Sequence, residues 1–140
     1  MKKNLEAYEN FVRARNLLLN AEDYEEAKRE FLWPNIVEFN WAIDYFDKIA
    51  EEESSPAILY VDEGVEESVS FRELKFRSNK VANFLKENRL VKGERILLLL
   101  SNRIELFETF LDAMKVGCTT IPASLLLTAK DIEDRILREK

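Results

Sequence analysis

The sequence predicts an α/β fold: N-terminal helices, a β-hairpin, and then βαβα units of a parallel sheet. Apolar residues recur at helical spacing in the first fifty positions, and two strand-like runs then flank a turn at Gly64. From residue 71 onward, helical patterns alternate with short apolar runs. The run RILLLL at residues 95–100 has no polar alternation, which is typical of a strand covered on both faces of a parallel sheet.

Composition excludes several classes of protein. The 140 residues are 46% hydrophobic and 34% charged, as in an ordinary soluble domain. The formal charge of −6 opposes nucleic acid as a partner. The longest apolar run is far shorter than the roughly 20 residues of a membrane span. Charges interrupt the apolar residues of the N-terminus, so it does not have the pattern of an export signal.

Three residue types are scarce in a way that limits the chemistry. Cys118 is the only cysteine, so no intrachain disulfide can form and we expect a cytoplasmic location. There is no histidine, which removes His-based acid–base catalysis and the commonest metal ligand. Gly64, Gly93 and Gly117 are isolated, so the sequence contains neither a dinucleotide fingerprint nor a phosphate-binding loop of the Walker type.

Residues 1–50 are predicted to be a helical N-terminal extension. Leu5, Tyr8, Val12 and Leu19 recur at helical spacing, and the charged segment EDYEEAKREF continues as a short helix that ends before Trp33-Pro34.

Asn40 is then placed to cap a further helix, WAIDYFDKIA. We expect Ile43, Phe46 and Ile49 to share its buried face, with Trp41 and Tyr45 nearby.

Residues 51–140 are predicted to be an α/β segment. The charged stretch EEESSP reads as a linker, and AILYVDE and ESVSF read as the two strands of a hairpin. The segment Ser70-Phe-Arg-Glu73 is a capping box that begins a helix running towards Asn88. The apolar stripe of that helix is Phe71, Leu74, Val81, Ala82 and Leu85.

The rest of the chain repeats this pattern of strands and capped helices. Lys92-Gly93 turns the chain into the strand RILLLL, and Asn102-Arg-Ile-Glu105 is read as a second capping box. The helix it begins should bury Phe107, Phe110, Leu111 and Met114, and should end at Gly117.

The strand CTTIP follows, and its crossover from the preceding strand should be right-handed. The segment Thr128-Ala-Lys-Asp131 caps a last helix, which is still in helical register at Lys140. We therefore expect the chain to be the front of something longer.

The most informative segment is the connection after the last strand, where Leu125, Leu126 and Leu127 stand in place of polar residues. Ligand sites of open α/β sheets gather at the carboxyl ends of strands, so the three leucines could line a site. Alternatively, the three leucines pack beneath the following helix as part of the hydrophobic core.

Other candidate residues have simpler explanations. Asp62-Glu63 could bind a metal but suits a solvated turn, and Cys118 has no histidine to activate it as a nucleophile. Arg103 could contact an anion or be an ordinary surface residue. Trp41, Tyr45 and Phe46 could stack on an aromatic ligand, although aromatics at helical spacing are more often core.

Five blocks of sequence, taken in order, resemble a known family: WPNIVEFNWAIDYFDKIA, PAILYVDEG, SFRELKFRSNKVANFLKE, KGERILLLLSNRIE and MKVGCTTIPASLLLTAKDIEDRI. Together they look like the N-terminal part of an AMP-forming acyl-CoA synthetase of the medium-chain type. This family belongs to the adenylating superfamily with firefly luciferase and the adenylation domains of peptide synthetases. The resemblance implies an incomplete part of a larger N-terminal domain.

The resemblance also implies chemistry for the parent enzyme. It would join a carboxylic acid to coenzyme A with ATP and magnesium, giving acyl-CoA, AMP and pyrophosphate. The segment matching residues 122–128 would lie beside the coenzyme A channel, which makes Ser124, Leu125 and Leu126 candidate channel residues. The family's Ser/Thr/Gly-rich phosphate loop and later nucleotide motifs are absent, so the isolated chain is expected to be inactive and to bind no cofactor.

Two alternatives stay open at this point. The chain could be a stand-alone interaction module without catalysis, or part of another adenylating enzyme, such as a peptide-synthetase adenylation domain. As a fragment it should expose sheet edges and apolar surface, which favours self-association.

Overall fold

The computed structural model describes residues 2–138, and it confirms a mixed α/β architecture. The N-terminal helical elements are α1 (Lys2–Asn20), α2 (Tyr24–Glu30), the π-helix η1 (Trp41–Phe46) and α3 (Asp47–Glu52). The remaining elements are β1 (Pro56–Asp62), β2 (Val65–Ser70), α4 (Phe71–Glu87), β3 (Arg95–Leu98), α5 (Ile104–Val116), β4 (Thr119–Pro122) and α6 (Ala129–Arg138).

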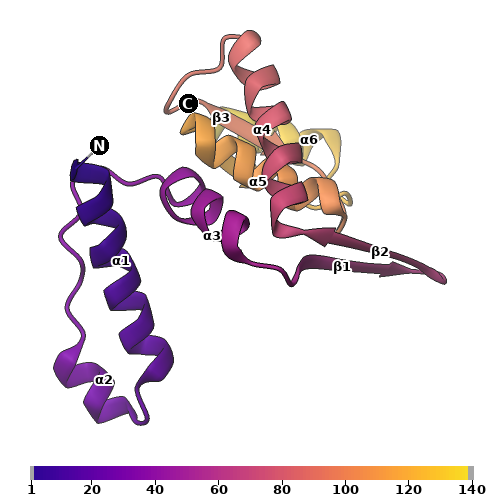
Figure 1. The fold of residues 1–140 in the computed structure, drawn as a ribbon. Helices are drawn as coiled ribbons and strands as arrows, with labels where there is room; N and C mark the ends of the chain where they lie inside the picture. Colours follow the sequence, from indigo (N-terminus) through magenta and orange to yellow (C-terminus); the bar gives the residue numbers. More distant parts are fainter. Residues whose placement is uncertain (1, 139–140) are drawn as a thin grey trace.

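The elements form three regions (Figure 1). Helices α1 and α2 stand to one side, the β1–β2 hairpin projects as a thin ribbon on another, and α4 to α6 surround the short strands β3 and β4. The last helix was expected to be still in helical register at Lys140, and that residue lies outside the described residues.

Both predicted pairings of strands are present. β1 and β2 pair antiparallel, and the turn between them places Glu63 and Gly64 at positive φ, as a two-residue hairpin loop requires. β3 and β4, which α5 connects in sequence, pair in parallel, with Leu98 opposite Pro122. The strand RILLLL is shorter than predicted: pairing stops at Leu98, and Leu100 is already 36% exposed.

The hydrophobic core lies where η1, α3, β2, α4 and α5 meet. Its buried members are Ala42, Phe46, Ala50, Val69, Leu74, Ile104 and Leu111. Ala42, Phe46 and Ala50 belong to the predicted extension of residues 1–50 but share this core with later elements, and the boundary itself stays a prediction.

The helix capped by Asn40 departs from the predicted register. Asn40 is the cap, because its side-chain oxygen accepts from the amides of Ala42 and Ile43. The first turn is a π-helix, however, in which the Asp47 amide donates to the carbonyl of Ala42, five residues back. This wider turn leaves Ile43 45% exposed, so its predicted place on the buried face is wrong.

Helix α5 also corrects the prediction. It begins at Ile104 with Arg103 in the cap position, and no side chain caps it, so the capping box read at Asn102 is wrong. Phe107 and Met114 are 47% and 41% exposed rather than buried. The buried face instead includes Glu108, Asp112 and Lys115, among Ile104, Leu111 and Ala113.

The end of α5 is as predicted. Gly117 adopts φ +84°, and its amide donates to the carbonyl of Met114 while that of Cys118 donates to Ala113. This pair of bonds is a Schellman motif, which needs a residue in the left-handed region. The turn aims the chain directly into β4.

Candidate functional site

The segment of interest is the connection from β4 to α6, residues 123–128, here called the leucine loop. β3 and β4 are parallel, so this loop leaves the sheet at the same edge as the connection from β3 to α5. The Ala123 amide donates to the carbonyl of Leu98 over 2.9 Å, which continues the strand pairing up to the start of the loop.

Local hydrogen bonds shape the leucine loop. The hydroxyl oxygen of Ser124 accepts from the amide of Leu126 at 3.1 Å, and the Ser124 carbonyl accepts from the amide of Leu127 at 3.2 Å. These bonds close a tight turn that presents the two intervening side chains outward. The conformation of the loop is therefore set by its own backbone and one serine.

The leucines do not share one environment. Leu125 is 59% exposed and Leu126 is 91% exposed, whereas Leu127 is half-buried. The reading of all three leucines as core is therefore wrong for Leu125 and Leu126. The turn therefore leaves two neighbouring leucine side chains open to solvent at the end of β4.

A complete capping box closes the leucine loop. The Thr128 amide donates to Asp131 Oδ2 at 2.9 Å, and the Asp131 amide donates to Thr128 Oγ1 at 3.3 Å. Hydrogen bonds from Thr128 lower the pKa of the Asp131 carboxyl, which stays ionised at the start of α6. This predicted cap is confirmed and fixes the exit of the loop.

The remaining candidates have structural roles in the part of the chain that is described. Tyr60 donates its hydroxyl to Asp62 at the hairpin end, and no cluster of acidic or sulfur side chains among residues 2–138 could hold a metal ion. Arg103 pairs with Glu105 beside it.

Cys118 lies directly before β4, half-buried, and its thiol contacts the Val91 carbonyl at 3.6 Å. Burial raises the pKa of the thiol, which disfavours the nucleophilic thiolate. This environment suits a structural cysteine and not a nucleophile.

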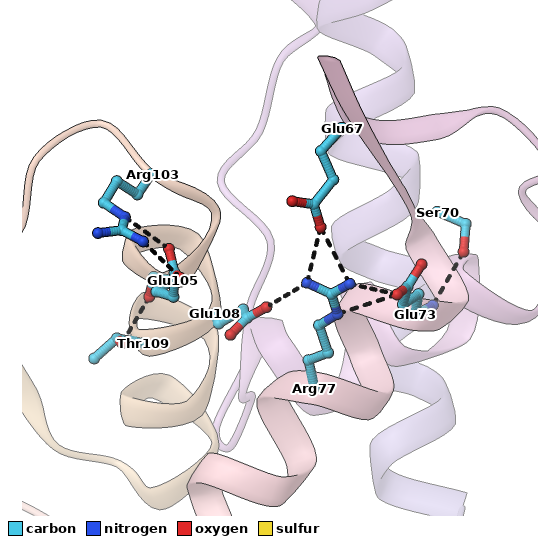
Figure 2. A network of polar contacts seen from close by, with 8 residues as sticks. All are labelled: Glu67, Ser70, Glu73, Arg77, Arg103, Glu105, Glu108 and Thr109. Carbon is cyan, nitrogen blue, oxygen red and sulfur yellow. Dashed lines mark hydrogen bonds and ion pairs between the residues drawn. The ribbon is translucent and has the colours of Figure 1, made fainter. Parts of the chain in front are cut away.

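An ion-pair network that sequence patterns did not reveal joins three elements (Figure 2). The guanidinium of Arg77 on α4 contacts Glu67 of β2, Glu73 one turn earlier, and Glu108 of α5. These carboxylates raise the pKa of Arg77, with Glu73 contributing most. Glu73 therefore binds Arg77, while Ser70 alone caps α4 by accepting from the Glu73 amide at 3.2 Å.

A second polar cluster lies at the α3, α4 and α5 contact. Lys115 donates to Ser78 Oγ at 2.9 Å and Asn79 Oδ1 at 2.7 Å, and pairs with Asp47 at 2.8 Å. Asp112 is fully buried beside it, and neither of its carboxylate oxygens has a hydrogen-bond partner among the described residues. Burial, with the nearby charge of Glu108, raises the pKa of Asp112 to about 7.

None of the described helices is long and apolar enough to cross a membrane.

Sequence relatives agree on one type of enzyme. The chain is 33% identical over 129 residues to the human mitochondrial acyl-coenzyme A synthetase ACSM3, covering 86% of this chain and 22% of that protein. It is 31% identical over 101 residues to the uncharacterized acyl-CoA ligase YtcI of Bacillus subtilis, covering 71% of this chain and 19% of that one. The chain thus spans about a fifth of the length of these curated relatives.

Solved structures support the same fold. The N-terminal subdomain of Klebsiella oxytoca NpsA superposes with a TM-score of 0.61 at 24% identity, covering 69% of this chain and 24% of the other. A fatty acid AMP ligase from Legionella pneumophila gives a TM-score of 0.62 at 21% identity, covering 69% and 18%. The family model described as AMP-binding enzyme matches residues 46–138. This chain therefore belongs to the AMP-binding enzyme family, as a relative of its acyl-CoA ligases.

Proposed function

We propose that this chain is the N-terminal segment of an AMP-forming acyl-CoA synthetase. The parent enzyme would convert a carboxylic acid, ATP and coenzyme A into acyl-CoA, AMP and pyrophosphate. Membership of the AMP-binding family, with acyl-CoA ligases and synthetases among the relatives, supports this proposal. A cytoplasmic location and a role in fatty acid metabolism belong to the same proposal.

The isolated chain is proposed to be inactive. Its residues do not fit ATP or magnesium: the three glycines are isolated, and no acidic cluster among residues 2–138 could hold a metal ion. No step of adenylation can therefore be assigned to side chains of this segment.

The leucine loop is the part of the chain that fits coenzyme A. The pantetheine arm of the coenzyme carries amides and a dimethyl group, and the loop offers a serine hydroxyl with two exposed leucines, Leu125 and Leu126. Coenzyme A supplies the thiol that accepts the acyl group. Ser124, Leu125 and Leu126 would give one wall of the passage along which this arm is oriented, and the rest of the enzyme would give the other.

The alternative is a stand-alone interaction module without catalysis. The exposed leucines of the loop favour it, since they would suit a protein partner as well as a pantetheine arm.

One pair of experiments separates the two functions. The chain alone should give no ATP–pyrophosphate exchange with acids from acetate to dodecanoate. A chimera in which the chain replaces the matching 129-residue stretch of ACSM3 should form acyl-CoA. Exchange by the isolated chain would contradict its proposed inactivity. A folded chimera that binds ATP but forms no acyl-CoA would favour the interaction module.

A further inference from the structure

The β1–β2 hairpin has an unpaired edge on each side. β1 and β2 pair only with each other among the described strands, so the outer side of each strand has no neighbouring strand. In Figure 1 the hairpin projects from the rest of the chain as a two-stranded ribbon. A ribbon of this kind is marginally stable by itself, and added strands stabilise it.

The two-residue loop determines which backbone groups point to the free edge of β1. Hydrogen-bonded and non-hydrogen-bonded pairs alternate along an antiparallel ladder. Asp62 and Val65, which flank the loop, form a pair of the hydrogen-bonded kind, and Tyr60, two positions earlier, belongs to the next pair of that kind. Leu59 and Val61 belong to the alternate pairs, so their amides and carbonyls point away from β2.

The side chains at this edge are apolar and open to solvent. Leu59 and Val61 are 63% and 60% exposed. No charged residue occurs from Ala57 to Val61, and Pro56 limits the edge because it has no amide hydrogen. Charged side chains commonly protect edge strands from association, and the β1 edge lacks that protection between these residues.

The edge formed by β2 is protected by charge. The residues of β2 opposite Val61 and Leu59 are Glu66 and Ser68, with Glu67 between them. Two copies paired through the outward groups of Glu66 and Ser68 would place Glu67 opposite its counterpart in the second copy. Like charges directly opposite each other are destabilising, so charge favours pairing through β1.

We propose that the β1 edge binds a second copy of this chain, in an antiparallel pair whose two-fold axis passes beside Tyr60. Leu59 of each copy then lies opposite Val61 of the other, and these two residues exchange both of their outward hydrogen bonds. Asp62 lies opposite Ile58 of the other copy, so no two carboxylates face each other. The pairing joins two hairpins into one continuous sheet.

The β1 edge is complementary to itself, which selects a second copy as its occupant. A two-fold contact uses the same patch on both molecules. In this register Leu59 and Val61 supply the apolar side chains and the free backbone groups on both sides of the axis. The contact needs neither ATP nor coenzyme A, so it can succeed or fail independently of the proposed enzyme activity.

The test measures mass against concentration by sedimentation equilibrium, in a chain whose Leu125 and Leu126 are replaced by glutamate. These replacements prevent the exposed leucines of the leucine loop from contributing to association. A monomer–dimer equilibrium is expected with a dissociation constant between roughly 10 μM and 1 mM, because a contact between two strands is small.

Two lysine substitutions at equally exposed valines separate the β1 edge from the rest of the hairpin. Val61→Lys puts a cation on the edge, and the two-fold axis repeats it, so the dissociation constant should rise at least about tenfold. Val65→Lys is the matched control, because Val65 is 61% exposed but lies on β2, and it should leave the constant unchanged. Circular dichroism should show both variants folded.

A disulfide tests the register. Tyr60 would face its counterpart across the axis in a non-hydrogen-bonded pair, where the β-carbons come close enough for a disulfide. With Cys118 replaced by serine, Tyr60→Cys should form a covalent dimer on mild oxidation. Ser68→Cys, which lies on β2, should remain largely monomeric.

Any of three results would overturn the proposal. One is a chain that stays monomeric up to about 1 mM. Another is an equal effect of Val61→Lys and Val65→Lys on the dissociation constant. The last is a dimer in which Tyr60→Cys cross-links no faster than Ser68→Cys, since the two copies would then meet elsewhere.

Discussion

At the scale of single residues, substitution of Leu126 tests the hypothesis that the leucine loop lines a coenzyme A channel. In the ACSM3 chimera, Leu126→Arg would place a long cation beside the proposed pantetheine path. We expect the thioester-forming half-reaction to slow at least about tenfold, or 1.4 kcal/mol, while pyrophosphate exchange changes much less. The two half-reactions would be measured separately.

The Leu126 side chain is 91% exposed, so its substitution should not disturb the core. An effect on the channel can therefore be told apart from an effect on folding. The melting temperatures of the isolated Leu126→Arg and Leu126→Ala chains should match the parent within about 2 °C, since surface changes of this kind are usually worth within 0.5 kcal/mol. An equal loss of both half-reactions with a lowered melting temperature would contradict the channel assignment.

Asp112 predicts an unusual dependence of stability on pH. Its pKa rises from 3.8 to about 7 in the folded chain, so between these values the folded state keeps a proton that the unfolded state releases. The contribution of Asp112 to stability is therefore full below pH 3.8 and is lost as pH rises through about 7. The expected loss is on the order of 1–4 kcal/mol.

Asp112→Asn removes the charge while keeping the shape of the side chain. Urea unfolding should find the variant more stable than the parent at pH 8 and similar or less stable at pH 5. Glu133→Gln, on the exposed surface of α6, supplies the control and should behave alike at both pH values. A destabilisation by Asp112→Asn that is the same at both values would disprove this account.

Single residues also show what the sequence could not predict. Phe107 and Met114 were expected to be buried on α5, yet Asp112 and Lys115 are buried instead. Lys115 is accommodated because α3 and α4 supply Asp47, Ser78 and Asn79. Helical periodicity reports which residues share a face, but not the polar partners on other elements that allow a charge to be buried.

At the scale of elements, the boundaries set by local chemistry were predictable. Ser70 and Thr128 cap their helices and Gly117 ends α5, because each interaction is confined to a few neighbouring residues. The cap read at Asn102 failed because the chain bends there, with the Arg103 amide donating to Ser101, and α5 starts later. The π-turn of η1 was unpredictable, since Asn40 suits either kind of helix.

Gly117 gives an element-scale prediction. Gly117→Ala should destabilise the chain by about 1–2 kcal/mol from the left-handed backbone alone, and more because its Cβ would lie 3.0 Å from Lys92 Cγ. Gly93→Ala is the matched control, since Gly93 also has positive φ but its Cβ would meet nothing within 4 Å. Thermal unfolding of both variants should rank Gly117→Ala as the less stable. The reverse order would mean that the Lys92 contact relaxes without cost.

At the scale of the whole molecule, exposed apolar surface should promote association. β3 and β4 pair only with each other among the described strands, and Leu125, Leu126, Ile136 and Leu137 are exposed nearby in the chain. Light scattering should show a mass that rises with concentration, and replacing Leu125 and Leu126 with glutamate should reduce it. A mass that stays monomeric for the parent chain at high concentration would contradict the prediction.

The α/β class and the order of elements followed from the sequence because they depend on repeated local patterns. The Arg77 network did not, because it joins Glu67, Glu73 and Glu108 from three elements (Figure 2). The leucine loop lies between these cases: its position after β4 was predictable, but the separate environments of Leu126 and Leu127 depend on the turn made by Ser124. Its role beside coenzyme A stays a prediction.

The π-turn of η1 also bears on how this region can change in evolution. A π-turn holds one residue more than an α-turn between bonded groups, so one residue can be lost there while both flanks keep their orientation. Ile43 is the natural candidate, because it is 45% exposed while Ala42 and Phe46 on either side are buried. Relatives that differ here by a single-residue deletion can therefore keep the same core, and an alignment gap at this point need not signal a different fold.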